Sequence, residues 1–385
     1  MVPLPAMTTA AANSEYLRGL NSMKRSIKHD RLNLPWRRNC AGIIRTRGLT
    51  ALLAALLVGQ AYGHSDAQPE IYKLQNSKLS YSFTPQIGGR GLAFSAAGEK
   101  NLLKVGTAVQ EQPNPDISPQ AGFIPYQGHI IWPGPQADWW KQQEVNPQRR
   151  AAGAVWPPDP FTVLNDYELT AVSDKSATIV SPVSPVTGLQ LTKEFTLKDD
   201  VLLHRVTAVN RRETPVKWDI WFNTRVSPET RVYVPIADFS RDLRLEKFPE
   251  MTTEVKADAE KQRLGLFGFA RGENIKAKAF IEPSAGWIAA FTQGQLFVIE
   301  FPRQARDSIH PDQGQVELYL EQDPQNPDAG VLELEVHAPY RELAPGESMS
   351  ATETWRALTY TGKNSVEAHL RALRELGLQG VSSPQ

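Results

Sequence analysis

Tryptophans and prolines are concentrated in one stretch of the chain, where they could form a surface for a flat ligand. Residues 111–160 contain ten prolines and four tryptophans. Indole rings stack on the apolar C–H faces of pyranose sugars, and a few polar groups beside them fix the ligand's orientation. Core tryptophans usually lie on regular elements, so the Pro-flanked Trp132 and Trp156 favour the binding interpretation. The indoles that we expect to contact a sugar are Trp132, Trp139, Trp156 and Trp221, whereas Trp287 and Trp355 are assigned to the core.

Two arginines could complete such a surface. Arg90 and Arg225 each carry a planar guanidinium that donates paired hydrogen bonds to hydroxyl or carboxylate groups. Asn165-Asp-Tyr167 and Asp312 offer oxygen ligands, but their spacing is not that of a calcium loop. The sequence has neither a phosphate-binding glycine loop nor a Gly-x-Ser-x-Gly elbow. We therefore predict a sugar or oligosaccharide partner, with no metal and no cofactor.

Carboxylates and histidines elsewhere in the sequence could transfer protons. Glu335 lies between Leu334 and Val336, so in a β-strand its side chain and that of His337 point to one face. The same alternation also describes an ordinary polar face of an antiparallel sheet. His129 precedes an apolar run, where it could act as an acid or hold a loop by hydrogen bonds.

The elements that must position these residues are mostly strands. Leu79, Tyr81 and Phe83 alternate with polar residues, which is the period of a half-buried strand. Lys198-Asp-Asp200 indicates the turn of a hairpin. Further strands are predicted at residues 189–197, 201–209, 216–222, 286–291, 296–301, 316–320, 331–337 and 348–358.

Three regions depart from this pattern. Residues 111–160 show little periodicity, but their aromatic content argues against disorder, so we expect an ordered, proline-stiffened excursion. Residues 240–275 are charged and predict a loop-rich excursion with strands. Residues 364–376 are expected to form a helix that Asn364 caps and Gly377 ends.

The order of these elements predicts the fold class. Many short strands without strand–helix alternation are typical of an all-β fold, here an antiparallel β sandwich. No Gly/Ser-rich or Pro-rich linker separates two periodic halves. We therefore expect one domain over residues 64–385, with its core at 70–360.

The first 63 residues have the composition of an export signal. They contain nine basic and two acidic residues, and residues 48–63 form an uncharged, Leu/Ala-rich run that ends in Ala61-Tyr-Gly63. A basic region, a short apolar run and a small-residue exit are typical of a secretory signal peptide. The run is shorter than the roughly 20 residues of a spanning helix, which disfavours a membrane anchor. We expect cleavage near Gly63 and a periplasmic or secreted protein, with Met1 or Met23 as the start.

The charge balance of the whole chain is a sum over unlike parts. The 385 residues include 42 basic and 42 acidic side chains, and removing residues 1–63 leaves 33 basic and 40 acidic ones. The resulting excess of acidic residues disfavours nucleic acid and anionic membrane surfaces as partners. Cys40 is the single cysteine, so residues 64–385 can hold neither a disulfide nor a Cys-based zinc site.

Several motifs, in order along the chain, resemble those of one superfamily. The hairpin from Leu191 to Asn210 resembles the central hairpin of galactose mutarotase-like proteins, and the other matching segments are Ile87–Arg90, Lys100–Leu103, Glu335–Glu347 and Glu353–Trp355. Together with Gly128–Trp132 and Trp156–Asp159, they are most similar to a bacterial family of unknown function within that superfamily. The resemblance covers roughly residues 70–360 and implies the β supersandwich that aldose epimerases share with sugar-binding domains.

The resemblance also implies a chemistry. Aldose mutarotation needs one group to take the proton of the anomeric hydroxyl and another to protonate the ring oxygen. By resemblance Glu335 is the base and His129 the acid. The family's second histidine has no counterpart in Trp218–Arg225, where Asp219 takes approximately its place. A carboxylate can act as an acid there only if its pKa is raised.

Three functions stay open at this point. An exported aldose-epimerase-like enzyme would use Glu335 with His129 or Asp219. A non-catalytic carbohydrate-binding module would keep the sandwich and the indoles, and the missing second histidine favours it. A scaffold for envelope assembly would bind a protein partner, but it gives no reason for four indoles within 25 residues. A carbohydrate-active protein of the mutarotase-like class is the leading hypothesis, with turnover left open.

Overall fold

The computed structural model describes residues 68–247, 264–267, 275–322, 325 and 329–378. Residues Ala67–Gln385 form one compact unit. The predicted signal peptide, residues 1–63, lies outside the described residues, as does much of the predicted excursion at 240–275.

One sheet of the described chain has ten strands. Each neighbouring pair of strands is antiparallel. The strand order is β1 (Tyr72–Gln75), β2 (Leu79–Thr84), β3 (Arg90–Ala96), β4 (His129–Gly134), β9 (Val216–Val226), β17 (Val331–His337), β16 (Val316–Gln322), β13 (Ile275–Ile281) and β11 (Leu243–Lys247), with β18 (Arg341–Leu343) paired to β9.

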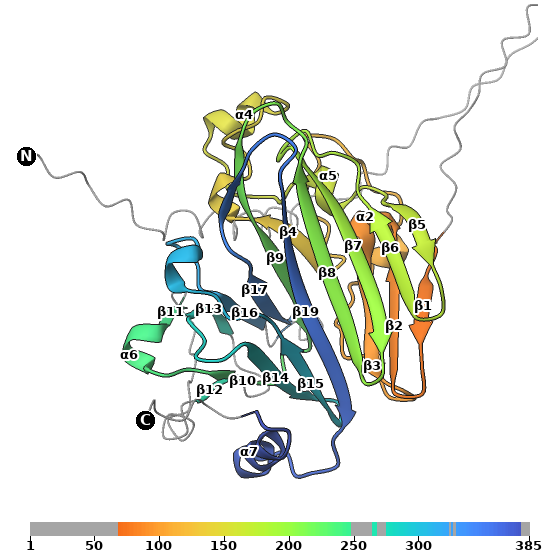
Figure 1. The fold of residues 1–385 in the computed structure, drawn as a ribbon, viewed down its shortest axis with the longest axis vertical. Helices are drawn as coiled ribbons and strands as arrows, with labels where there is room; N and C mark the ends of the chain where they lie inside the picture. The colour runs from red at the N-terminus through yellow and green to blue at the C-terminus, as the bar shows by residue number, and fades with distance from the viewer. Residues whose placement is uncertain (1–67, 248–263, 268–274, 323–324, 326–328, 379–385) are drawn as a thin grey trace, which may run out of the picture. The chain divides into compact units, whose positions relative to one another are not determined.

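The second sheet has nine strands in the described residues and is also antiparallel throughout. Figure 1 shows its long strands β7, β8 and β19 running side by side. The strand order is β12 (Leu264–Phe267), β10 (Arg231–Pro235), β14 (Trp287–Thr292), β15 (Gln295–Glu300), β19 (Ser348–Thr359), β8 (Val201–Asn210), β7 (Leu189–Lys198), β6 (Ser176–Val180) and β5 (Glu168–Val172).

The predicted hairpin forms β7 and β8. Its turn places Asp199 at a φ of 52°, a conformation that Asp tolerates better than most residues do. Every second residue of β7 is buried, including Leu191 and Phe195. The period-2 pattern of the sequence therefore gives both the strand and the face that it buries.

The two sheets pack face to face through aromatic side chains. Phe83 of β2 lies 4.9 Å from Phe195 of β7, and Phe94 of β3 lies 5.3 Å from Trp355 of β19, measured between ring centroids. Trp355 is fully buried and Trp287 is 5 % exposed, so both belong to the core, as predicted. The predicted antiparallel β sandwich is confirmed.

Helices are few and short in the described residues. Apart from the last one they are single turns: α2 (Gln86–Gly89), α3 (Ala108–Glu111), η2 (Gln136–Asp138), α4 (Pro147–Ala151), α5 (Pro160–Val163), α6 (Phe239–Asp242) and η4 (Arg306–Ser308). Across the described ranges, no helix combines the length and the hydropathy that crossing a membrane requires.

The predicted C-terminal helix is α7 (Val366–Glu375), and Gly377 follows it at a φ of 74°. The N-cap prediction was wrong by one residue. Ser365 caps the helix, because its side chain accepts a hydrogen bond from the backbone N–H of Ala368. Serine is a preferred N-cap residue, because its side-chain oxygen accepts from a backbone N–H of the first turn that has no partner within the helix. Ser365, and not Asn364, is therefore the N-cap of α7.

The predicted excursion at 111–160 is ordered, but part of it is a strand of the sheet. His129 and Trp132 both lie in β4, so the expectation that these two residues sit on a loop was wrong. Pro133 misleads here, because proline cannot donate to a sheet ladder. β3 meets β4 only at the pair Gly91 and His129, so the backbone nitrogen of Pro133 faces no partner strand.

Candidate functional site

Charged and aromatic side chains gather on the side of the ten-stranded sheet that faces away from the second sheet. Phe222 points toward the second sheet, where its ring lies 5.7 Å from that of His204 on β8. Its neighbours at odd positions of β9 therefore point outward. We call the following residues of β4, β9, β13, β16 and β17 the outer-face cluster: Trp132, Asp219, Trp221, Asn223, Arg225, Lys278, Glu317, Glu333, Glu335 and His337.

The register of neighbouring strands brings these side chains together. Across β9 and β17 the opposed pairs are Trp221 with His337, Asn223 with Glu335 and Arg225 with Glu333. Trp132 on β4 lies opposite Trp221, and Glu317 on β16 lies opposite Glu335. Side chains directly opposite one another in antiparallel strands are close enough to interact. β4, β9 and β17 are adjacent in Figure 1.

Buried ion pairs connect the cluster. Nζ of Lys278 lies 2.7 Å from Glu317 and 2.9 Å from Glu335. Nε of Arg225 lies 2.9 Å from Glu333. Glu335 and Glu317 are 1–2 % exposed at their side chains. Because both carboxylates are out of water, Lys278 is the group that compensates them.

His337 links this network to Asp219. Its Nδ1 lies 3.1 Å from Oδ2 of Asp219, and its Nε2 lies 3.7 Å from Oε1 of Glu317. Burial works to lower the pKa of His337, but the two acidic neighbours raise it to about 10. The imidazole is therefore protonated at neutral pH.

The two glutamates that share Lys278 differ in their protonation. Burial raises the pKa of Glu335 well above its usual range, and although Lys278 opposes this, Glu333 and Glu317 add to it. Burial also acts on Glu317, but Lys278 and His337 lower the pKa of that carboxyl to about 2. The cluster thus holds an ionised Glu317 beside a Glu335 that gives up its proton only above the ordinary carboxyl range.

The four tryptophans predicted for a sugar surface come together. Ring centroids lie 4.9 Å apart for Trp132 and Trp221, 5.5 Å for Trp132 and Trp139, and 6.2 Å for Trp139 and Trp156. The Arg225 guanidinium lies 4.8 Å from the Trp132 ring, so the indoles and the charges form one structure. Trp132, Trp139 and Trp221 are 1–4 % exposed and Trp156 is half-buried. The rings are therefore packed mainly against each other.

Three polar atoms along β9 make no hydrogen bond within the described protein. They are Oδ1 of Asp219, Nε1 of Trp221 and Oδ1 of Asn223, and all three are buried. They alternate along one strand face as acceptor, donor and acceptor. Buried polar atoms nearly always have a partner, so these three mark a place where a ligand could supply one.

Two predicted site residues lie elsewhere. Arg90 donates to the carbonyl oxygens of Ile87, Gln127 and Val163, so it holds the chain segments around it. His129 points into the space between the sheets, because it is three residues from Trp132 and side chains alternate along a strand. The structure therefore does not bring His129 to Glu335.

The sequence analysis missed two charged members of the outer-face cluster, Lys278 and Glu317. Both lie on strands with a visible alternation, Lys276-Ala-Lys278 in β13 and Glu317-Leu-Tyr319 in β16. The two-residue alternation of each strand could have assigned these side chains to one face of it. That alternation could not have shown that β13, β16 and β17 are neighbours in the sheet.

Comparisons with known proteins concern the family of the chain and its fold. A family model described as "Domain of unknown function (DUF4380)" matches residues 70–358. No curated protein matches the chain.

Among solved structures, the chain is similar to a candidate aldose 1-epimerase from Escherichia coli K12, with 16 % identity, 75 % of this chain and 99 % of that chain covered, and a TM-score of 0.52. A candidate aldose 1-epimerase from Klebsiella pneumoniae subsp. pneumoniae MGH 78578 has 12 % identity, covers 82 % and 85 % of the two chains, and has a TM-score of 0.51. A galactose mutarotase related enzyme from Lactobacillus acidophilus has 10 % identity, covers 76 % and 99 %, and has a TM-score of 0.46. At these identities the likeness to the two candidate aldose 1-epimerases concerns the fold, which is the galactose mutarotase-like sandwich that the motifs predicted.

Proposed function

This chain belongs to the family described as "Domain of unknown function (DUF4380)", and we propose that it is a carbohydrate-active protein of the aldose-epimerase-like class. The proposed site is the outer-face cluster, with a sugar or oligosaccharide as ligand. The observation that carries the proposal is the row of unpartnered atoms on β9, at Asp219, Trp221 and Asn223.

The chemistry of those atoms suits a sugar. Hydroxyl groups donate and accept hydrogen bonds, so the hydroxyls of a sugar or oligosaccharide can satisfy acceptors and a donor that alternate along a strand. The indoles of Trp132 and Trp221 supply apolar faces for C–H groups. Nζ of Lys278 lies 5.2 Å from the Trp221 ring, and the Arg225 guanidinium lies 4.8 Å from the Trp132 ring. Both add charged hydrogen-bond donors.

For turnover, Glu335 and His337 are the acid–base pair that fits a mutarotation. An oxygen of Glu335 and a nitrogen of His337 lie within 4.8 Å of each other, a spacing that could place them at the anomeric hydroxyl and the ring oxygen of one sugar. His337 donates as an imidazolium that Asp219 orients, and Glu335 accepts once it has lost its proton. His337 thereby takes the role that the sequence had suggested for His129.

A binding protein without turnover is the second candidate. It is favoured by the way that the acid–base groups are used, because Glu335 is held by Lys278 and His337 by Asp219. Such a network could simply stabilise the sheet face and orient a ligand.

Two measurements test these functions. A thermal-shift screen against aldohexoses and oligosaccharides, beginning with galactose and glucose, should find a sugar that raises Tm, and silence toward every sugar rules out both candidates. Polarimetry of that sugar then follows its mutarotation with the unaltered protein, with Glu335→Gln and with Glu321→Gln. Glu321 lies on the same sheet and is partly exposed beside Lys276, so its variant is the matched control. Turnover is supported if only Glu335→Gln loses the rate above buffer, whereas equal rates in all samples leave the binding function alone.

We also propose that the protein is exported, because of the basic and then Leu/Ala-rich sequence of residues 1–63. Expression of the full chain in a bacterial host, followed by fractionation and N-terminal sequencing, should find a shortened chain outside the cytoplasm that begins near residue 64. A full-length chain retained in the cytoplasm would contradict the proposal.

A further inference from the structure

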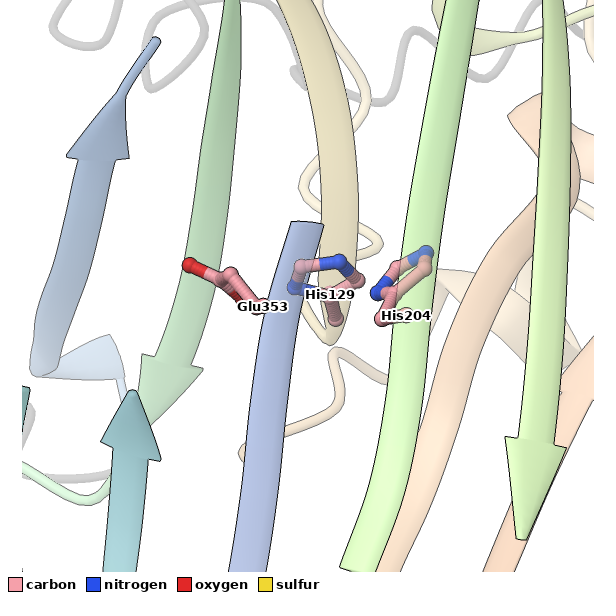
Figure 2. Close-up of side chains that lie close together, drawn as sticks. All are labelled: His129, His204 and Glu353. Carbon is pink, nitrogen blue, oxygen red and sulfur yellow. The ribbon is translucent and has the colours of Figure 1, made fainter. Parts of the chain in front are cut away.

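A second set of ionisable side chains lies between the two sheets, on the opposite side of β4 and β9 from the outer-face cluster. His204 of β8 and Glu353 of β19 are directly opposed in the nine-stranded sheet. His129 of β4 reaches them from the other sheet, and in Figure 2 its ring lies between the other two side chains. We call these three residues the inner triad. All three are 0–2 % exposed.

Each member of the inner triad presents at least one polar atom that makes no hydrogen bond within the described protein. These atoms are Nε2 of His129, both ring nitrogens of His204, and Oε1 of Glu353. One ligand-type atom from each residue lies within 4.8 Å of the others. Two imidazoles and a carboxyl thus converge without bonding to one another, although burial of unpaired polar groups is costly.

The remaining atoms of two members are held by neighbours that fix their orientation. Nδ1 of His129 lies 2.9 Å from the hydroxyl oxygen of Thr224. Oε2 of Glu353 accepts a hydrogen bond of 2.7 Å from the indole Nε1 of Trp355. Metal-binding histidines and carboxylates are commonly held in this way, with one atom bonded to a neighbour and the other directed at the ion.

We propose that His129, His204 and Glu353 bind a divalent transition-metal ion, with zinc as the best match, and that this ion clamps the two sheets together. Two imidazoles and one carboxylate are a common ligand set for zinc. Zinc holds such atoms at about 2.0–2.2 Å, so the three side chains must close by on the order of 1 Å around the ion. The site is separate from the proposed sugar site and does not depend on it.

Lys193 is the buried cation that acts on both histidines of the inner triad. Its ammonium is engaged elsewhere, because Nζ donates to the carbonyl oxygens of Gly88 and Gly89, at 2.8 Å and 2.9 Å.

Another trio with ligand-type atoms, Glu317, Glu335 and His337, is a poorer metal site. The ammonium of Lys278 already contacts both of its carboxylates at less than 3 Å. A divalent ion there would stand beside that cation and repel it. Within the described residues, no side chain of the inner triad makes a hydrogen bond or ion pair with an ammonium or guanidinium.

Metal analysis of the whole protein tests the proposal. The protein is unfolded with a chelator, refolded with or without Zn²⁺, and dialysed, and zinc is then measured by atomic emission. We expect a stoichiometric amount of zinc and a higher Tm in the zinc-refolded sample. Refolding with Co²⁺ should give the visible absorption of a tetrahedral site. A refolded protein without zinc and without a Tm shift overturns the proposal, as does a crystal structure with only water between the three side chains.

Variants separate this site from adventitious binding. His204→Gln should lose the bound zinc, whereas His310→Gln, at a histidine outside the triad, should keep it. Thr224→Val removes only the partner of His129 Nδ1 and should weaken zinc binding about 10- to 100-fold in competition with a chelator. Equal zinc affinity in the unaltered protein and in both His204→Gln and Thr224→Val would overturn the assignment of these residues. The unaltered protein's zinc content decides the matter if a variant fails to fold.

Discussion

Replacing Lys278 by methionine should destabilise the fold strongly, because it removes the cation between two buried carboxylates. The Lys278 side chain is 13 % exposed, and those of Glu317 and Glu335 are 2 % and 1 % exposed. Removing one partner of a buried ion pair typically costs about 3–5 kcal/mol, since the other charge is left in a medium that solvates it poorly. We expect a loss of that size in the free energy of unfolding at pH 7.

The pH dependence of this loss identifies its cause. Lys278 lowers the pKa of Glu317 in the folded protein, and a depressed folded pKa adds stability above the unfolded value that is lost as pH falls. Without Lys278 the buried carboxylates should have raised pKa values, which favour folding only when they are protonated. The difference between variant and unaltered protein should therefore be smaller at pH 4 than at pH 8.

Urea unfolding followed by circular dichroism, from pH 4 to pH 8, measures both quantities. Lys276→Met is the matched control on the same strand, because its ion pair with Glu321 is partly exposed, at 11 % and 31 % of the two side chains. That change should cost no more than about 1 kcal/mol. A loss for Lys278→Met that equals the control, or that does not change with pH, would refute the account of this network.

Three further predictions concern Gly134, the cap of α7 and Glu335. Gly134→Ala should lower Tm, because a Cβ there would lie 2.2 Å from Oδ1 of Asp219, and overpacking costs about 1–3 kcal/mol; an unchanged Tm would show that this contact relaxes freely. Ser365→Ala should cost about 1 kcal/mol through loss of the cap of α7, and Asn364→Ala next to nothing, by urea unfolding; the opposite ranking would restore Asn364 as the cap. Any mutarotation rate should rise with pH as Glu335 loses its proton, since the pKa of that group is raised; a rate that is already maximal at pH 5 would exclude it as the base.

Local patterns in the sequence predicted the strands and the faces of their side chains. Glu335 and His337 share the outward face of β17, as their spacing required, because a strand's two-residue period needs no knowledge of its neighbours. The hairpin of β7 and β8 was predictable for the same reason. The four indoles were expected to meet, and they do, since three of them belong to one short stretch of chain.

Long-range pairing was not predictable in the same way. Lys278 reaches Glu335 because β13 and β17 both flank β16, and no local pattern encodes the order of strands in a sheet. The inner triad was missed because its residues come from three distant strands. His129 was misplaced because Pro133 suggested a loop, although β4 is a strand whose proline faces no partner.

Titration calorimetry with two tryptophan variants tests the central claim, that the outer face of β9 binds a sugar. Trp221→Phe removes an indole N–H that has no partner in the described protein. Trp218 lies on the other face of β9, and Trp218→Phe removes an indole N–H that donates to the carbonyl oxygen of Thr187. With the best sugar from the screen, we predict that Trp221→Phe weakens binding at least about tenfold, which corresponds to about 1.4 kcal/mol, while Trp218→Phe, once shown to be folded, binds as the unaltered protein does. Equal affinity in Trp221→Phe and the unaltered protein would contradict the claim.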